Sequence, residues 1–148
     1  MNNNTAELHT SLIIARGWIA AFNAHDVAAL VQLYDPAAEL YDAGMKKARR
    51  GVEEIEGWFT QRFASLPEIN YTTKDEIVTG EQVAITWTVR GYTPRLLGQN
   101  WLRRSFTVDG VSVFHMDNWR IRHQRGYYDH LAVVERALPF LRLIPSRT

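Results

Sequence analysis

Residues 106–114 read Phe-Thr-Val-Asp-Gly-Val-Ser-Val-Phe, with an apolar residue at every second position on each side of Asp109-Gly110. A period of two is typical of a β-strand, because successive side chains point to opposite faces of a sheet. An Asp-Gly step inside such a run indicates a β-bulge. We therefore expect one long, bulged strand over residues 100–115.

The same alternation appears on both sides of this strand. It predicts further strands at 70–78, 82–93 and 119–129, separated by turn sequences at 79–81, 92–98 and 117–118. Upstream, apolar residues recur every three or four positions, which predicts helices at 5–24, 27–34 and 52–65. A short strand at 38–42 and a charged loop at 44–51 are expected between the second and third helices. After the last strand, a final helix is expected at 130–138. Helices followed by antiparallel strands favour an α+β fold, and long bulged strands indicate a sheet curved around a pocket.

The composition is that of one globular domain. The chain has 148 residues, 46% of them hydrophobic. Its net charge is +1, so it lacks the strong positive electrostatic potential that attracts nucleic acids or anionic membranes. A basic cluster at residues 46–50 is best interpreted as a solvated loop. With no cysteine, no signal-like N-terminus and no apolar run of about 18 residues, we expect a cytoplasmic protein without disulfides or membrane contact.

No cofactor is expected. The five histidines include no pair at helical i, i+4 spacing, and nearby acids add no pattern typical of a metal site. The glycines at 91 and 98 are isolated, so the sequence also lacks a glycine-rich phosphate loop.

Two segments resemble known families. Residues 25–34 (His-Asp-Val-Ala-Ala-Leu-Val-Gln-Leu-Tyr), then Ala-Glu-Leu-Tyr-Asp at 38–42 and Gly51, resemble the opening of bacterial ketosteroid isomerases. Residues 106–114, with Trp-Arg-Ile at 119–121 and Tyr-Tyr-Asp at 127–129, are similar to SnoaL-like polyketide cyclases. The resemblance implies a single nuclear transport factor 2-like (cystatin-like) domain over residues 1–148. In that fold a cone-shaped, curved antiparallel sheet packs on three N-terminal helices.

Asp42 is the first candidate catalytic residue. It matches the isomerase aspartate that moves a proton between carbons, although an aspartate that caps loop N–H groups is the alternative. The isomerases also use a tyrosine and a protonated acid as hydrogen-bond donors to the substrate oxygen. Trp18 and Val111 occupy those two positions here, and this departure argues against steroid isomerisation.

Asp129 and His115 are the other catalytic candidates. Asp129 matches a cyclase acid/base position, and the alternative is an N-cap for the last helix. His115 shares a strand face with Val111 and Val113, and pairing across the 117–118 turn would place it in one concavity with Asp129. The alternative for His115 is a structural histidine. His123 and Arg125 would need partners on an interior face, so this end of the sheet is also open to being a dimer surface, with the parity changed at a bulge.

The remaining prediction concerns the ligand and the assembly. Large or apolar side chains are expected to line a pocket for a small hydrophobic molecule, namely Trp18, Tyr41, Trp58, Trp87, Trp101 and Val111. The expected function is a cofactor-independent isomerase or cyclase that moves protons in a hydrophobic carbonyl compound. Asp42 would be its base, with Asp129 or His115 as the acid. The alternative is a non-catalytic binding or assembly module. A homodimer is expected through the convex face of the sheet.

Overall fold

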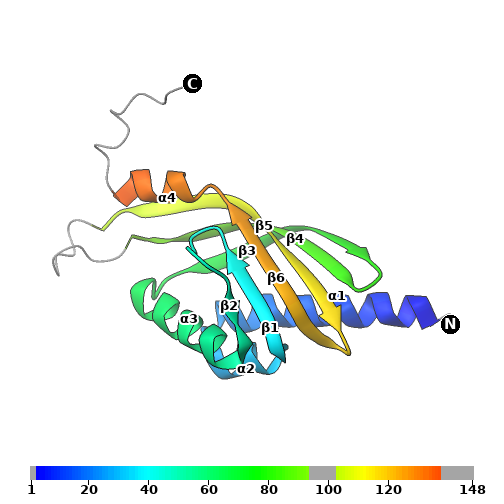
Figure 1. Cartoon of the computed structure of the whole chain (residues 1–148). Helices are drawn as coiled ribbons and strands as arrows, with labels where there is room; N and C mark the ends of the chain where they lie inside the picture. The colour runs from blue at the N-terminus through cyan, green and yellow to red at the C-terminus, as the bar shows by residue number, and fades with distance from the viewer. Residues whose placement is uncertain (1–2, 94–102, 138–148) are drawn as a thin grey trace.

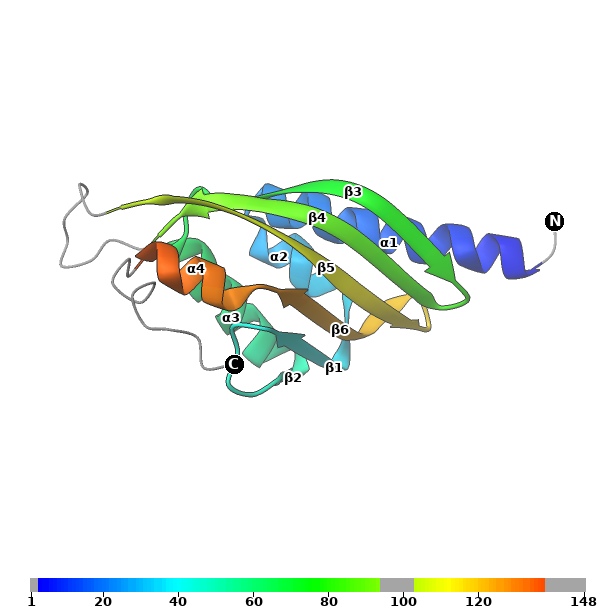
Figure 2. The ribbon, with the colours of Figure 1, turned by 90° about the horizontal axis from the view of Figure 1, so that it is seen from above.

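The structure is a computed structural model that describes residues 3–93 and 103–137. Its elements follow the order α1 (Asn3–Asn23), α2 (Val27–Gln32), β1 (Tyr34–Asp42), β2 (Arg49–Arg50), α3 (Gly51–Ser65), β3 (Asn70–Thr79), β4 (Gln82–Tyr92), β5 (Ser105–Asp117), β6 (Arg120–Tyr128) and α4 (His130–Ala137). A curved sheet carries α1, α2 and α3 along one face, and α4 lies at the end of the sheet where β6 finishes (Figures 1 and 2). The α+β prediction is therefore confirmed.

The sheet has six strands in the order β2-β1-β6-β5-β4-β3. Every neighbouring pair is antiparallel except β1 and β6, which run parallel. The predicted antiparallel sheet thus contains one parallel pair. The short strand β2 also lies inside the segment that we expected to be a loop.

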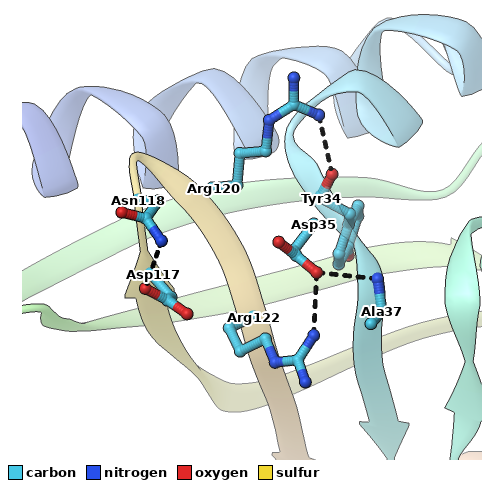
Figure 3. A network of polar contacts seen from close by, with 7 residues as sticks. All are labelled: Tyr34, Asp35, Ala37, Asp117, Asn118, Arg120 and Arg122. Atoms are coloured by element: carbon cyan, nitrogen blue, oxygen red, sulfur yellow. Dashed lines mark hydrogen bonds and ion pairs between the residues drawn. The ribbon is translucent and has the colours of Figure 1, made fainter.

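The start of β1 differs from the prediction, because β1 begins at Tyr34 and α2 already ends at Gln32. Two arginines of β6 hold this start in place (Figure 3). Arg122 donates to the carboxylate of Asp35 at 2.8 Å, and Arg120 donates to the carbonyl oxygen of Tyr34 at 3.4 Å. Contacts so distant in sequence override the local helical spacing.

The expected bulge at Asp109-Gly110 is absent, since β4 and β5 pair without a register shift from Gln82 to Tyr92. Gly110 faces the core instead, where a Cβ atom would lie 2.4 Å from Trp87 Cη2. The glycine thus makes room for the indole of Trp87, whose N–H donates to Ser112 Oγ at 3.0 Å. Val111 consequently faces outward.

A register shift occurs instead between β5 and β6, next to His115 and Met116. On β6 it leaves Ile121 and Gln124 both buried, and His123 exposed. A change of parity at a bulge, which the sequence left open, is therefore what the structure contains.

An aromatic core fills the space between the helices and the sheet. Trp18 of α1 is 2% exposed and stacks on Phe22 with ring centroids 5.2 Å apart. Its indole N–H donates to the Tyr34 hydroxyl at 2.8 Å, and that hydroxyl donates to the side-chain oxygen of Gln124. Among the described residues, no helix is long and apolar enough to cross a membrane.

Candidate functional site

A cavity of about 390 Å³ opens between α3, the sheet and α4. Its apolar and aromatic walls are Trp58, Leu66, Ile69, Tyr71, Trp87, Val89, Phe106, Tyr128, Val133 and Val134, and its polar lining residues are Gln61, Arg62, Ser65, Thr93 and His130. This volume and this mostly apolar lining are typical of a site for a small organic molecule. We call it the main cavity.

Asp42 lies behind the wall of the main cavity, at the end of β1. The residue is 9% exposed. Its Oδ1 atom accepts the Gly44 N–H at 2.9 Å and the Tyr128 hydroxyl at 2.8 Å, and Arg62 Nη1 lies 3.9 Å from the same oxygen. Asp42 lines only a smaller inner cavity, of about 10 Å³, whose wall also includes Arg62. Among the described residues, it is Tyr128 and Arg62 that connect Asp42 with the main cavity.

Arg62 links the two cavities, because its side chain lines both and is only 14% exposed. Burial alone would lower the pKa of Arg62, but the nearby charge of Asp42 raises it and leaves it above its ordinary value. The guanidinium also lies over the ring of Trp58, 5.4 Å from its centroid. The main cavity thus contains a fixed positive charge on an aromatic wall.

Two tyrosines complete this polar end of the main cavity. Burial, helped by the charge of Asp42, raises the pKa of Tyr128 to about 12. Burial also raises the pKa of Tyr71. Both phenols therefore stay protonated at neutral pH and act as hydrogen-bond donors.

Asp129 does not line either cavity. It is exposed, and its Oδ1 accepts the Ala132 N–H at 3.0 Å, which makes it the N-cap of α4. This is the alternative that the sequence left open. We expect Asp129→Ala to lower the free energy of unfolding by about 1 kcal/mol, and Asp129→Asn to change it little, since asparagine caps equally well. Urea unfolding followed by circular dichroism checks this, and equal losses in both variants would contradict it.

His115 lies on the opposite face of the sheet from the main cavity. It pairs with His123 across β5 and β6, with ring centroids 6.0 Å apart, and its Nδ1 is 3.3 Å from the side-chain nitrogen of Gln82. The expected strand pairing is therefore present. The concavity belongs to the other face, however, because Ser112 and Phe114 of β5 are the buried residues.

The expected ligand-binding residues are divided among several places. Trp58 and Trp87 line the main cavity, and Trp18 lines the inner cavity. Tyr41 alternates with the buried Leu40 and Asp42, and so lies on the outer face with Val111. Trp101 lies outside the described residues.

Arg62, Tyr71, Tyr128 and His130 were not singled out from the sequence as site residues. A signal for Arg62 was present, because it follows Ile55 by seven residues and Phe59 by three. A charged residue was thus placed on the buried face of α3. Such a residue needs a buried partner. Tyr128 lies on the same face of β6 as Gln124 and Gly126, because the three alternate along the strand. The sequence does not show that this face is the buried one unless the position of the bulge in β6 is known.

Comparison with known proteins gives a family match and several similar structures. Residues 15–124 match the family model described as a SnoaL-like domain. A putative SnoaL-like polyketide cyclase from Jannaschia sp. CCS1 is 15% identical with a TM-score of 0.77, covering 93% of this chain and 97% of that one. A hypothetical protein with a ketosteroid isomerase-like fold from Catenulispora acidiphila DSM 44928, crystallised in complex with trimethylamine, is 21% identical with a TM-score of 0.73, covering 84% of this chain and 91% of that one.

A cystatin-fold protein from Novosphingobium aromaticivorans is 25% identical with a TM-score of 0.66, covering 79% of this chain and 97% of that one. No curated protein matches this chain. The similar structures agree with the fold predicted from the sequence resemblance, whereas the residues of the main cavity have to be interpreted from their own geometry.

Proposed function

This chain belongs to the SnoaL-like domain family, and we propose that its main cavity binds a hydrophobic carbonyl compound and moves a proton within it without a cofactor. The observation that carries this proposal is Arg62, a charged side chain held inside a mostly apolar cavity by Asp42 at 3.9 Å. A fixed guanidinium in a site screened from water stabilises the negative oxygen that forms when a carbonyl compound loses an α-proton.

In the proposed reaction the carbonyl oxygen faces Arg62 and Tyr71, and the α-carbon faces the oxygen of Tyr128. The C–H bond breaks, its proton passes to the Tyr128 oxygen, and the phenolic proton passes to Asp42 Oδ1 along their 2.8 Å hydrogen bond. The electron pair of the C–H bond moves onto the carbonyl oxygen as an enolate beside Arg62. Asp42 is then the base, acting through Tyr128.

Protonation of the enolate at another carbon completes an isomerisation. For ring closure, the enolate carbon instead bonds to a second carbonyl carbon of the ligand, the π pair of that carbonyl moves onto its oxygen, and Asp42 returns the proton to this oxygen through Tyr128. The reverse relay returns the proton to the same carbon. His130, which is exposed and lines the main cavity with its ring centroid 6.0 Å from that of Tyr128, supplies a proton of its own at another carbon. The solvent then takes the proton from Asp42 and restores that of His130. An imidazole is suited to this step because it can both donate and accept a proton.

A second candidate function is binding without catalysis. One oxygen of Asp42 already accepts hydrogen bonds from Gly44 and Tyr128 and faces Arg62, and Asp42 has no surface in the main cavity. A carboxylate held in this way supports the position of Arg62, whether or not it ever takes a proton. The cavity would then only store or carry its ligand.

Proton exchange separates the two functions. With 2-tetralone, a bicyclic ketone, in D₂O, proton NMR reports loss of the α-proton signals, and thermal shift reports binding by mass action. The proposal expects both a raised melting temperature and exchange faster than in buffer. A raised melting temperature without faster exchange favours the binding module. If a panel of aromatic ketones gives no thermal shift and no faster exchange, the proposal of a carbonyl ligand is refuted.

We also propose that two copies of the chain pair through the outer face of the sheet. Val111, Val113 and the 45% exposed Tyr127 lie there, and α1, α2 and α3 cover only the other face (Figures 1 and 2). Light scattering is expected to give about twice the 17.1 kDa mass of one chain, and Val113→Glu is expected to return it to one. Ile13→Glu, a charge added at a 53% exposed position of α1, on the side of the sheet that the helices cover, is the control. A wild-type monomer at micromolar concentration would contradict the proposal.

A further inference from the structure

A second concave site lies at the other end of β5 from the main cavity. The turns β3–β4 and β5–β6 meet α1 there and enclose a cleft of about 190 Å³, lined by Ser11, Glu81, Met116, Asp117, Asn118 and Trp119. The backbone holds the two turns together, since the Met116 N–H donates to the Glu81 carbonyl oxygen at 2.8 Å. We call it the turn cleft. It shares no lining residue with the main cavity.

The charge of the turn cleft is negative. Glu81 and Asp117 are both exposed acids, and neither forms an ion pair with another residue in the described part of the chain. Asp117 Oδ1 accepts the side-chain N–H of Asn118 at 3.0 Å, as Figure 3 shows at the tip of the hairpin. The nearest arginine or lysine in sequence to Asp117, Arg120, is directed to the carbonyl oxygen of Tyr34. The two carboxylates are therefore free to attract a cation.

Two further groups point to the kind of cation. Trp119 is 56% exposed, so an indole face is available next to the two acids. Ser11 is only 2% exposed, yet its hydroxyl lines the cleft and makes no hydrogen bond within residues 3–93 and 103–137. The Ser11 oxygen is not among the fully buried atoms that lack a partner, so it keeps contact with the cleft, where a ligand can donate a hydrogen bond to it. Among the described residues no group of three or more His, Cys, Asp or Glu could hold a metal ion.

We propose that the turn cleft binds an organic ammonium group, with its charge between Glu81 and Asp117, an N–H donated to Ser11 Oγ, and its methylene or methyl groups on the ring of Trp119. Ammonium groups are attracted to the faces of tryptophan rings, and the attraction strengthens when carboxylates lie close by. The shared chemistry fits two sources, a free alkylamine and a lysine side chain of a partner protein.

The test uses NMR of the full chain, following the Met116 methyl group and the Asn118 side-chain amide, both of which line the cleft. The probes are n-butylammonium chloride for a free amine and Nα-acetyl-lysine amide for a lysine side chain, each against equal NaCl. The neutral alcohol 1-pentanol controls for apolar binding. Saturable shifts with a dissociation constant of about 1–10 mM are expected for one or both amines, and not for the alcohol.

Two variants localise the effect. Trp119→Gly removes the indole at a backbone φ of +62°, which glycine adopts readily, and the double variant Glu81→Gln with Asp117→Asn removes both charges. Each is expected to weaken amine binding at least about tenfold, whereas Glu53→Gln, an exposed acid of α3, should not. Tighter binding of the lysine amide identifies a protein partner as the source, and tighter binding of butylammonium identifies a free amine. Shifts that equal those in NaCl, or that persist in both variants, would overturn the proposal.

Discussion

Tyr128→Phe is expected to slow the α-proton exchange of 2-tetralone by about 10²- to 10⁴-fold relative to the wild type, while binding changes little. The phenol is the only group in the described chain that both lines the main cavity and donates a hydrogen bond to Asp42. Removing its oxygen breaks the path from the substrate carbon to the carboxylate. The ring remains, so the wall of the cavity keeps its shape.

The measurement is the exchange rate by proton NMR at saturating ketone, after circular dichroism has shown that each variant is folded. Asp42→Asn should lose a similar factor, because an amide cannot take the phenolic proton. Asp129→Asn is the matched control, since Asp129 is exposed, caps α4 and contacts neither cavity. Unchanged exchange in Tyr128→Phe would eliminate the relay, and equal losses in Asp129→Asn would show that the assay follows stability.

Much of the fold could be predicted because the relevant signals are local. Asp26 caps α2 through its bond to the Ala29 N–H, and the helical spacing from Ile55 to Phe63 marks α3 within one residue of its start. The strands β3 and β4 follow from alternation and the turn at Gly80. Each of these features is decided by neighbours a few positions away.

The errors have a common physical cause in contacts between distant segments. The strand β1 begins at Tyr34 because β6 supplies its partners about 87 residues later. The Asp-Gly step at 109–110 looked like a bulge because Val108 and Val111 differ in parity. The structure keeps the parity by placing Gly110 under Trp87 and turning Val111 outward. A single sequence does not show which apolar residues of a strand lie on the outer face of the sheet instead of in the core.

The candidate site was predictable only in part. Asp42 was identified from a family resemblance, and the structure places it beside the main cavity but not in its wall. Its partner Arg62 lies on α3, whereas Asp42 lies on β1. The two charges are brought together by the fold, so their separation along the sequence does not indicate that they pair. His115 shows the converse, since the pairing of its strand across the 117–118 turn was predicted correctly but the face of the sheet was wrong.

Arg62→Met is expected to lower the free energy of unfolding by about 3–5 kcal/mol, the cost typical of removing one partner from a buried ion pair. Asp42 would remain 9% exposed, with hydrogen bonds from Gly44 and Tyr128 but no cation. Asp42→Asn leaves Arg62 buried without its anion, so it should also be destabilised.

The double variant Arg62→Met with Asp42→Asn separates the charge from the packing. With neither charge buried, the protein should be more stable than Arg62→Met alone, because the penalty comes from an unpaired charge rather than from lost volume. Urea unfolding followed by circular dichroism gives the three free energies. Arg16→Met, which breaks the exposed pair with Glu76, should change stability little and serves as the control. A double variant no more stable than Arg62→Met would mean that Asp42 and Arg62 are not coupled. In that case Asp42 would not stabilise the positive charge of Arg62 in the mostly apolar main cavity, and the proposed function would lose its main support.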